Sequence, residues 1–105
     1  MKVNYKNKDW DAGRVKGFFG KDLLNLEHGG VKIVKVAPHS TYPVHIHPDK
    51  TEFLYLLEGN LICSVEENEF ECQKDDFLVF PHKQKHSIKN NTDKTALAIV
   101  GNIKI

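Results

Sequence analysis

Apolar residues alternate with polar ones in short runs along most of the chain, which is the pattern expected of β-strands. In the clearest run, residues 31–36, β-branched residues mostly alternate with lysines until Pro38 ends it. Further strands are predicted at residues 44–47, 52–58, 61–66, 69–73, 77–80, 86–89 and 96–100. The apolar run at residues 23–26 fits a strand or a helical turn equally well. Short strands at regular intervals, without a long helix, predict an all-β sandwich or barrel.

Two of these strands flank Glu67 and Asn68 and are predicted to form a β-hairpin with a two-residue loop. Asn68 can adopt the left-handed conformation that such a turn needs. In this register Cys63 lies opposite Cys72, and both thiols are on one face of the hairpin. We expect them to be free thiols that act as small core groups.

Length and composition indicate one compact domain that covers residues 1–105, with an N-terminal arm and the first strands in residues 1–30. Fifteen Lys and Arg residues against fourteen Asp and Glu leave a formal charge of +1, so we expect no nucleic-acid partner. No stretch is long and apolar enough to suggest a membrane partner, and the polar start does not resemble a signal peptide, so we expect a cytoplasmic protein.

Histidine is the unusual count, with six in 105 residues. His45 and His47 are two positions apart, so on an extended strand both imidazoles project from the same face. Glu52 has the opposite parity, but a turn at Pro48 and Asp49 can bring it to the same cavity. Two neutral imidazoles with one carboxylate suit a divalent ion such as Fe, Mn, Ni, Cu or Zn, without selecting among them.

The spacing of these residues resembles the first motif of the cupin superfamily. That motif is met at His45, His47, Glu52 and Gly59, and the family's second motif at Pro81, His86 and Asn90. Residues 40–91 carry both motifs. The resemblance implies a double-stranded β-helix, which is a jelly-roll barrel, and one divalent metal ion held by His45, His47, Glu52 and His86.

The sequence departs from the cupin pattern at three positions. His39, Asp75 and Lys83 stand where the family has glycine. Glycine often marks a positive φ angle, so these departures affect the expected loop conformations and remove no ligand.

Strand parity also suggests a substrate pocket and an oligomer. Leu54 and Leu56 are expected on the same strand face as Glu52, and Ile88 on the same face as His86. Tyr42 precedes the first histidine pair. These four residues are therefore candidate pocket walls or ordinary barrel core. The apolar side chains that point outward favour a homodimer. This outward set is Phe53, Tyr55 and Leu57, with Phe18 and Phe19 on the N-terminal arm.

Three lysines, Lys83, Lys85 and Lys89, surround His86 in the sequence. They could attract an anionic substrate or simply belong to a solvated face.

The resemblance implies a small metal-dependent enzyme that acts on a small polar or phenolic metabolite. Its activity would be oxygenase-like, as in a dioxygenase, or isomerase-like. The alternative is a non-catalytic cupin module that binds or senses a small ligand.

Overall fold

The computed structural model describes all residues from 1 to 105 and contains ten β-strands with one short 3-10 helix. In chain order the elements are η1 (Tyr5–Asn7), β1 (Asp11–Ala12), β2 (Phe18–Leu26), β3 (Gly29–Val36), β4 (Ser40–His45), β5 (Lys50–Glu58), β6 (Leu61–Val65), β7 (Asn68–Cys72), β8 (Phe77–Phe80), β9 (His86–Asn90) and β10 (Ala96–Lys104). No helix of this chain has the length and hydrophobicity that crossing a membrane requires.

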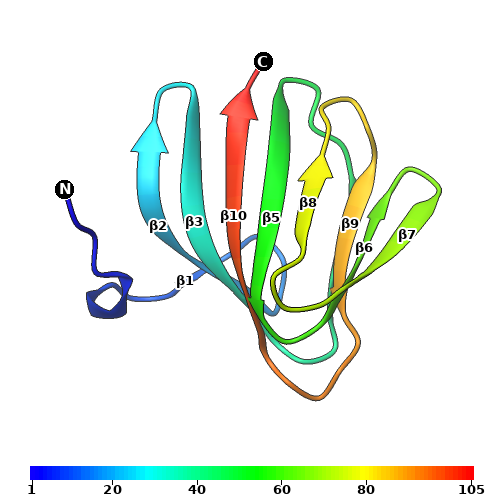
Figure 1. Cartoon of the computed structure of the whole chain (residues 1–105), viewed down its shortest axis with the longest axis horizontal. Helices are drawn as coiled ribbons and strands as arrows, with labels where there is room; N and C mark the ends of the chain where they lie inside the picture. Colours follow the sequence, from blue (N-terminus) through cyan, green and yellow to red (C-terminus); the bar gives the residue numbers. More distant parts are fainter.

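The strands form two antiparallel sheets that close around one core. The larger sheet has the order β1-β2-β3-β10-β5-β8, and the smaller has the order β4-β9-β6-β7. Figure 1 shows the larger sheet in front, with β9, β6 and β7 beyond its edge strand β8. Some neighbours in these sheets are far apart in sequence, as in β10 between β3 and β5. The predicted all-β jelly-roll barrel, or double-stranded β-helix, is confirmed.

The core lies between the two sheets and is built by the inward positions of each strand. On β5, Leu54 and Leu56 are fully buried, and Ala98 of β10 packs beside them. Leu61 of β6 and Phe80 of β8 belong to the same cluster, and so does Phe18 of β2, so the expectation that Phe18 contributes to the exposed apolar set is wrong. Burial of each large apolar side chain contributes about 1.5–3 kcal/mol, so this alternating pattern determines which face of each strand turns inward.

The structure decides one segment that the sequence left open and moves one predicted strand. Residues 23–26, which fitted a strand or a helical turn, are the end of β2. The strand predicted at residues 44–47 begins and ends earlier, because β4 covers Ser40–His45 and residues 46 and 47 lie outside it. Strand alternation therefore does not by itself place His47.

The β6–β7 hairpin forms with a register different from the predicted one. Val65 pairs with Asn68, so the turn residues are Glu66 and Glu67, and Glu66 has the positive φ of 52°. Cys63 therefore faces Phe70 and not Cys72, so the predicted direct pairing is wrong. The two cysteines still share one face of the hairpin as diagonal neighbours, and both are free and buried.

The three positions where the cupin pattern has glycine adopt left-handed backbone. The φ angles are 56° at His39, 75° at Asp75 and 64° at Lys83. This conformation costs a residue with a side chain about 1–2 kcal/mol. Asp75 partly offsets the cost because it accepts a hydrogen bond of 2.8 Å from the Tyr55 hydroxyl. The loop geometry of the pattern is thus kept without its glycines.

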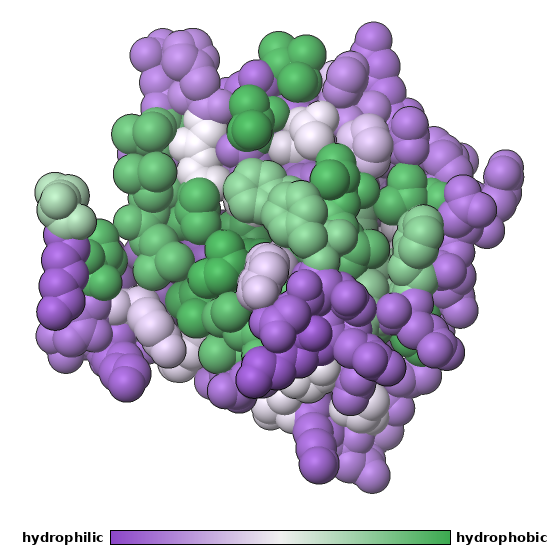
Figure 2. All heavy atoms as spheres, viewed as in Figure 1, coloured by the Kyte–Doolittle hydropathy of each residue, from purple (hydrophilic) through white to green (hydrophobic).

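The outer face of the larger sheet is apolar. Phe53 of β5 stacks on Phe77 of edge strand β8, with ring centroids 5.8 Å apart. Phe77, Val79 and Ile103 are each about half exposed, at 58%, 48% and 57%. Figure 2 shows hydrophobic residues gathered over the middle of this face.

Candidate metal centre

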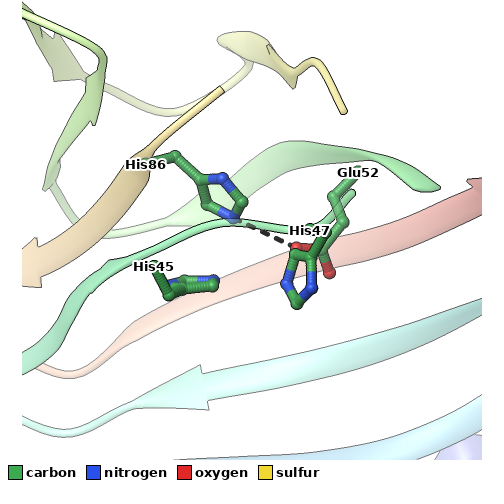
Figure 3. Close-up of side chains that lie close together, drawn as sticks. All are labelled: His45, His47, Glu52 and His86. Carbon is green, nitrogen blue, oxygen red and sulfur yellow. Dashed lines mark hydrogen bonds and ion pairs between the residues drawn. The ribbon is translucent and has the colours of Figure 1, made fainter. Parts of the chain in front are cut away.

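Four side chains converge at one end of the barrel, from both sheets. His45 is the last residue of β4, His86 the first of β9, and Glu52 lies near the start of β5. His47 comes from the loop between β4 and β5. One potential ligand atom from each residue lies within 4.8 Å of all the others, and Figure 3 shows the four side chains turned toward a common point.

Two of the distances between these atoms match those of ligands around one ion. Glu52 Oε1 lies 2.9 Å from His47 Nε2 and 3.2 Å from His86 Nε2. Metal–ligand bonds of about 2.1 Å that meet at a right angle separate their ligand atoms by about 3 Å. The donor set therefore fits a divalent first-row ion with only small side-chain adjustments.

Backbone carbonyls orient two of the imidazoles. His45 Nδ1 lies 2.8 Å from the Pro43 carbonyl oxygen, and His86 Nδ1 lies 3.4 Å from that of Gln84. Because a carbonyl only accepts, each Nδ1 is the donor in this contact, and each Nε2 is the nitrogen that is left to bind a metal ion at the centre. His86 Nε2 lies 3.2 Å from Glu52 Oε1, within hydrogen-bonding distance, and a divalent ion at the centre would take the place of the proton between them.

Electrostatics keep two of the residues in their ligating forms at neutral pH. Burial lowers the pKa of His47 below its ordinary value, although the adjacent Glu52 acts in the opposite direction. For Glu52, burial alone would raise the pKa, but the hydrogen bond with His86 and the nearby His47 and Lys50 together hold the pKa below its usual range. A neutral imidazole and an ionised carboxylate are the forms that bind metal.

His47 is held in place by the loop that follows β8. The Lys83 backbone N–H donates a 2.8 Å hydrogen bond to the His47 carbonyl oxygen. One residue earlier, the His82 N–H donates to Thr51 Oγ1 at 3.2 Å, beside Glu52. These contacts, and not strand alternation alone, bring His47 to the other ligands.

A cavity of about 450 Å³ opens beside the centre and includes His45, His47 and Glu52 in its lining. Of the four candidate wall residues, Tyr42, Leu54 and Ile88 line it. The ring of Tyr42 lies 4.7 Å from that of His45. Leu56, the fourth, is not part of this lining and is fully buried in the core.

His86 is the most enclosed of the four ligand candidates. Its side chain is 2% exposed, and the Phe80 ring stacks on it at 4.7 Å between centroids. The ligand set is thus closed on the His86 side and open toward the cavity.

Sequence reasoning missed three cationic side chains of the cavity wall, which belong to Arg14, Lys32 and Lys50. Lys50 shares the parity of Glu52 on one strand, and that signal could have identified it. Arg14 lies in a loop, and no local pattern indicates where its side chain goes. The lysines that surround His86 in the sequence are not part of the cavity lining.

Comparison with known proteins agrees with the architecture and the motifs. The family model described as a cupin domain matches residues 32–101. A tetracenomycin polyketide synthase protein from Streptomyces glaucescens is 30% identical over 88 residues, which cover 84% of this chain and 59% of that protein. The chain spans 59% and 49% of the lengths of two curated relatives that it matches.

Solved structures share the whole fold at low sequence identity. A predicted oxalate decarboxylase from Thermotoga maritima superposes with a TM-score of 0.91, 18% identity and complete coverage of both chains. A sugar phosphate isomerase from Silicibacter pomeroyi has a TM-score of 0.85 and 22% identity, with 100% of this chain and 76% of that chain covered. At these identities the likeness establishes the fold alone.

Proposed function

Because the chain belongs to the cupin family, we propose that it is a metal-dependent enzyme with an oxygenase-like or isomerase-like activity. Its substrate is a small polar or phenolic metabolite. One divalent ion of Fe, Mn, Ni, Cu or Zn is held by His45, His47, Glu52 and His86. When bound, this ion supplies Lewis-acid or redox chemistry.

The observation that carries the proposal is the one-sided exposure of the ligand set. His86 is enclosed under Phe80, whereas His45, His47 and Glu52 border the cavity. Structural zinc sites are usually closed and rich in cysteine, whereas catalytic sites keep an open position. This centre contains no cysteine and opens on a cavity within the size range of small-molecule sites.

The chain's own residues have distinct tasks in this reading. The carbonyls of Pro43 and Gln84 fix the orientation of two imidazoles, and the Lys83 N–H fixes the loop of His47. Tyr42, Leu54 and Ile88 shape the wall and exclude water from the substrate's apolar part. The names of the relatives, which include a polyketide synthase protein and a sugar phosphate isomerase, are consistent with a small-molecule enzyme.

Reconstitution with single metals tests the proposal. Metal-free protein is loaded separately with Fe(II), Mn(II), Ni(II), Cu(II) or Zn(II) and incubated with catechols, flavonols, keto acids and sugars. Oxygen uptake and product formation are then followed, with the His47→Ala, His86→Ala double variant as the control. Turnover that depends on one metal and is lost in the double variant supports the enzyme. Saturable binding without product under every metal favours the sensing module instead.

We also propose that the protein is a homodimer whose copies meet through the outer face of the larger sheet. The outward positions of β5, β8 and β10 include Phe53, Phe77, Val79 and Ile103, and none of these is charged. Monomers rarely expose a contiguous apolar patch of this kind. A second copy brings an identical uncharged face and needs no charge complementarity.

A further inference from the structure

We propose that the ligand taken at this centre is a small organic anion whose charged group lies among Arg14, Lys32 and Lys50. The charged group is a carboxylate or a phosphate, and the rest of the molecule is apolar. This inference rests on the proposed function and names the substrate class of the same site.

The cavity has a strong excess of positive charge. Its lining contains three permanent cations, Arg14, Lys32 and Lys50, and a single carboxylate, that of Glu52. Glu52 already faces His47 and His86 within hydrogen-bonding distance, so its charge is directed to the metal centre. A divalent ion at that centre would add to the excess and would not cancel it. A cavity of one sign concentrates ligands of the opposite sign.

The three cations have no partner within the protein. Every ion pair of the chain involves a histidine, and none includes Arg14, Lys32 or Lys50. Lys32 is opposite Asp22 in the register of β2 and β3, yet the two side chains form no ion pair, and Asp22 does not line the cavity. Lys50 is opposite another cation, Lys104, in the register of β5 and β10.

Arg14 is positioned over the cavity by an anchored loop. The Gly13 N–H donates a 2.8 Å hydrogen bond to the Phe18 carbonyl and closes the loop on itself. The Ala37 N–H donates to the Gly17 carbonyl, also at 2.8 Å, and ties the loop to the end of β3. These bonds fix the backbone of the loop, and the exposed guanidinium that it brings to the cavity can bind a carboxylate or a phosphate through two parallel hydrogen bonds.

The remaining wall is apolar and selects the body of the ligand. Phe18, Val34, Leu54 and Ala98 line the cavity from four different strands. A cavity of about 450 Å³ is at the small end of the range for ligand pockets. The cavity thus combines cationic side chains with apolar walls. This combination fits an anion of about the size of a substituted aromatic acid or a short aliphatic acid.

Matched pairs of probes test this inference. Binding of benzoate, phenyl phosphate and the neutral benzamide is measured by titration calorimetry and ligand-detected NMR, on zinc-loaded and on metal-free protein. The variants are Arg14→Gln, Lys50→Gln and the triple variant that adds Lys32→Gln. The control is Lys74→Gln, which removes the same charge from an exposed residue outside the cavity lining.

We expect at least one of the two anions to bind about tenfold more tightly than benzamide, which corresponds to about 1.4 kcal/mol. Arg14→Gln and Lys50→Gln should each weaken that anion severalfold without changing benzamide binding, and Lys74→Gln should change neither. A preference for benzoate identifies a carboxylate site, and a preference for phenyl phosphate identifies a phosphate site.

The inference is overturned if neither anion binds at millimolar concentration, if benzamide binds equally well, or if the anion preference survives in the triple variant. Metal content measured on the same samples separates this result from the proposed function. Full metal occupancy without the cation-dependent preference refutes the anion site alone. A cation-dependent preference in a protein that holds no metal refutes the metal centre alone.

Discussion

Replacement of Asn90 by alanine should destabilise the fold strongly while leaving the metal centre intact. Asn90 is fully buried, and its amide makes four hydrogen bonds, which is its full capacity. Its Nδ2 donates to the carbonyls of Val36 at 3.1 Å and Lys94 at 2.8 Å. Its Oδ1 accepts from the backbone N–H and the hydroxyl of Thr92, at 3.0 and 2.8 Å. One side chain thus ties the loop before β10 to β3.

The magnitude follows from which partners stay buried after the substitution. The Val36 carbonyl lies in the core and would lose a buried hydrogen bond, which costs about 1–3 kcal/mol. The partners on Thr92 and Lys94 are partly exposed, and water can replace the lost bonds at a cost of about 1 kcal/mol for each residue. We therefore expect Asn90→Ala to lower the free energy of unfolding by about 3–5 kcal/mol, with a fall in Tm of about 10 °C or more.

The assay is urea unfolding of metal-free protein, followed by tryptophan fluorescence and circular dichroism. Asn91→Ala is the matched control, because Asn91 is an exposed neighbour that makes no side-chain hydrogen bond in the structure. It should change the free energy of unfolding by less than about 0.5 kcal/mol. A loss below about 1 kcal/mol in Asn90→Ala, or equal losses in both variants, would refute the reasoning.

Three further predictions concern strain, thiols and assembly. Lys83→Gly should raise the free energy of unfolding, measured in urea, by about 0.5–1 kcal/mol. The reason is that the substitution relieves the strain of the left-handed backbone (φ 64°), and this gain exceeds the entropy that glycine adds to the unfolded chain. An equal or lower stability would contradict this. Burial raises the pKa of the Cys63 and Cys72 thiols above their value in the unfolded chain. The buried neutral thiols therefore make their full contribution to the stability of the fold below the unfolded thiol pKa of about 8.5, and this contribution is lost as the pH rises above that value. The free energy of unfolding should therefore fall less steeply above that pH in the double alanine variant, and equal slopes would count against buried neutral thiols. Light scattering should report twice the 12.0 kDa of one chain, and Phe77→Lys should halve that mass; a monomeric wild-type protein would refute the dimer.

The strand pattern could be predicted from the sequence because half-buried strands require alternation, and β5 shows this in Leu54 and Leu56 against Phe53 and Tyr55. The register of the β6–β7 hairpin could not be predicted from the sequence. Its turn holds no glycine, and Glu66 takes the left-handed position that Asn68 was expected to take. A shift that keeps the same residues on the buried face leaves the hydrophobic pattern unchanged, so the pattern does not exclude it.

The candidate site likewise has one part that the sequence predicted and one part that it did not. The spacing of His45, His47 and Glu52 pointed to a metal centre, because few residue types bind first-row ions and these occur close together. The position of His47 depends on a hydrogen bond from Lys83, a residue 36 positions later, which no local pattern specifies. Arg14 enters the cavity only through the tertiary placement of its loop, and this part of the site required the structure.

The most direct test of the central claim is the metal content of the protein purified without added metal, measured by inductively coupled plasma mass spectrometry. The samples are the wild-type protein, the His47→Ala, His86→Ala double variant, and a His39→Ala, His82→Ala control that removes two histidines outside the donor set. We predict close to one divalent ion per chain in the wild-type protein and the control, and less than about a tenth of that in the double variant. Full occupancy in the double variant, or no ion in a wild-type protein supplied with each metal in turn, would contradict the account.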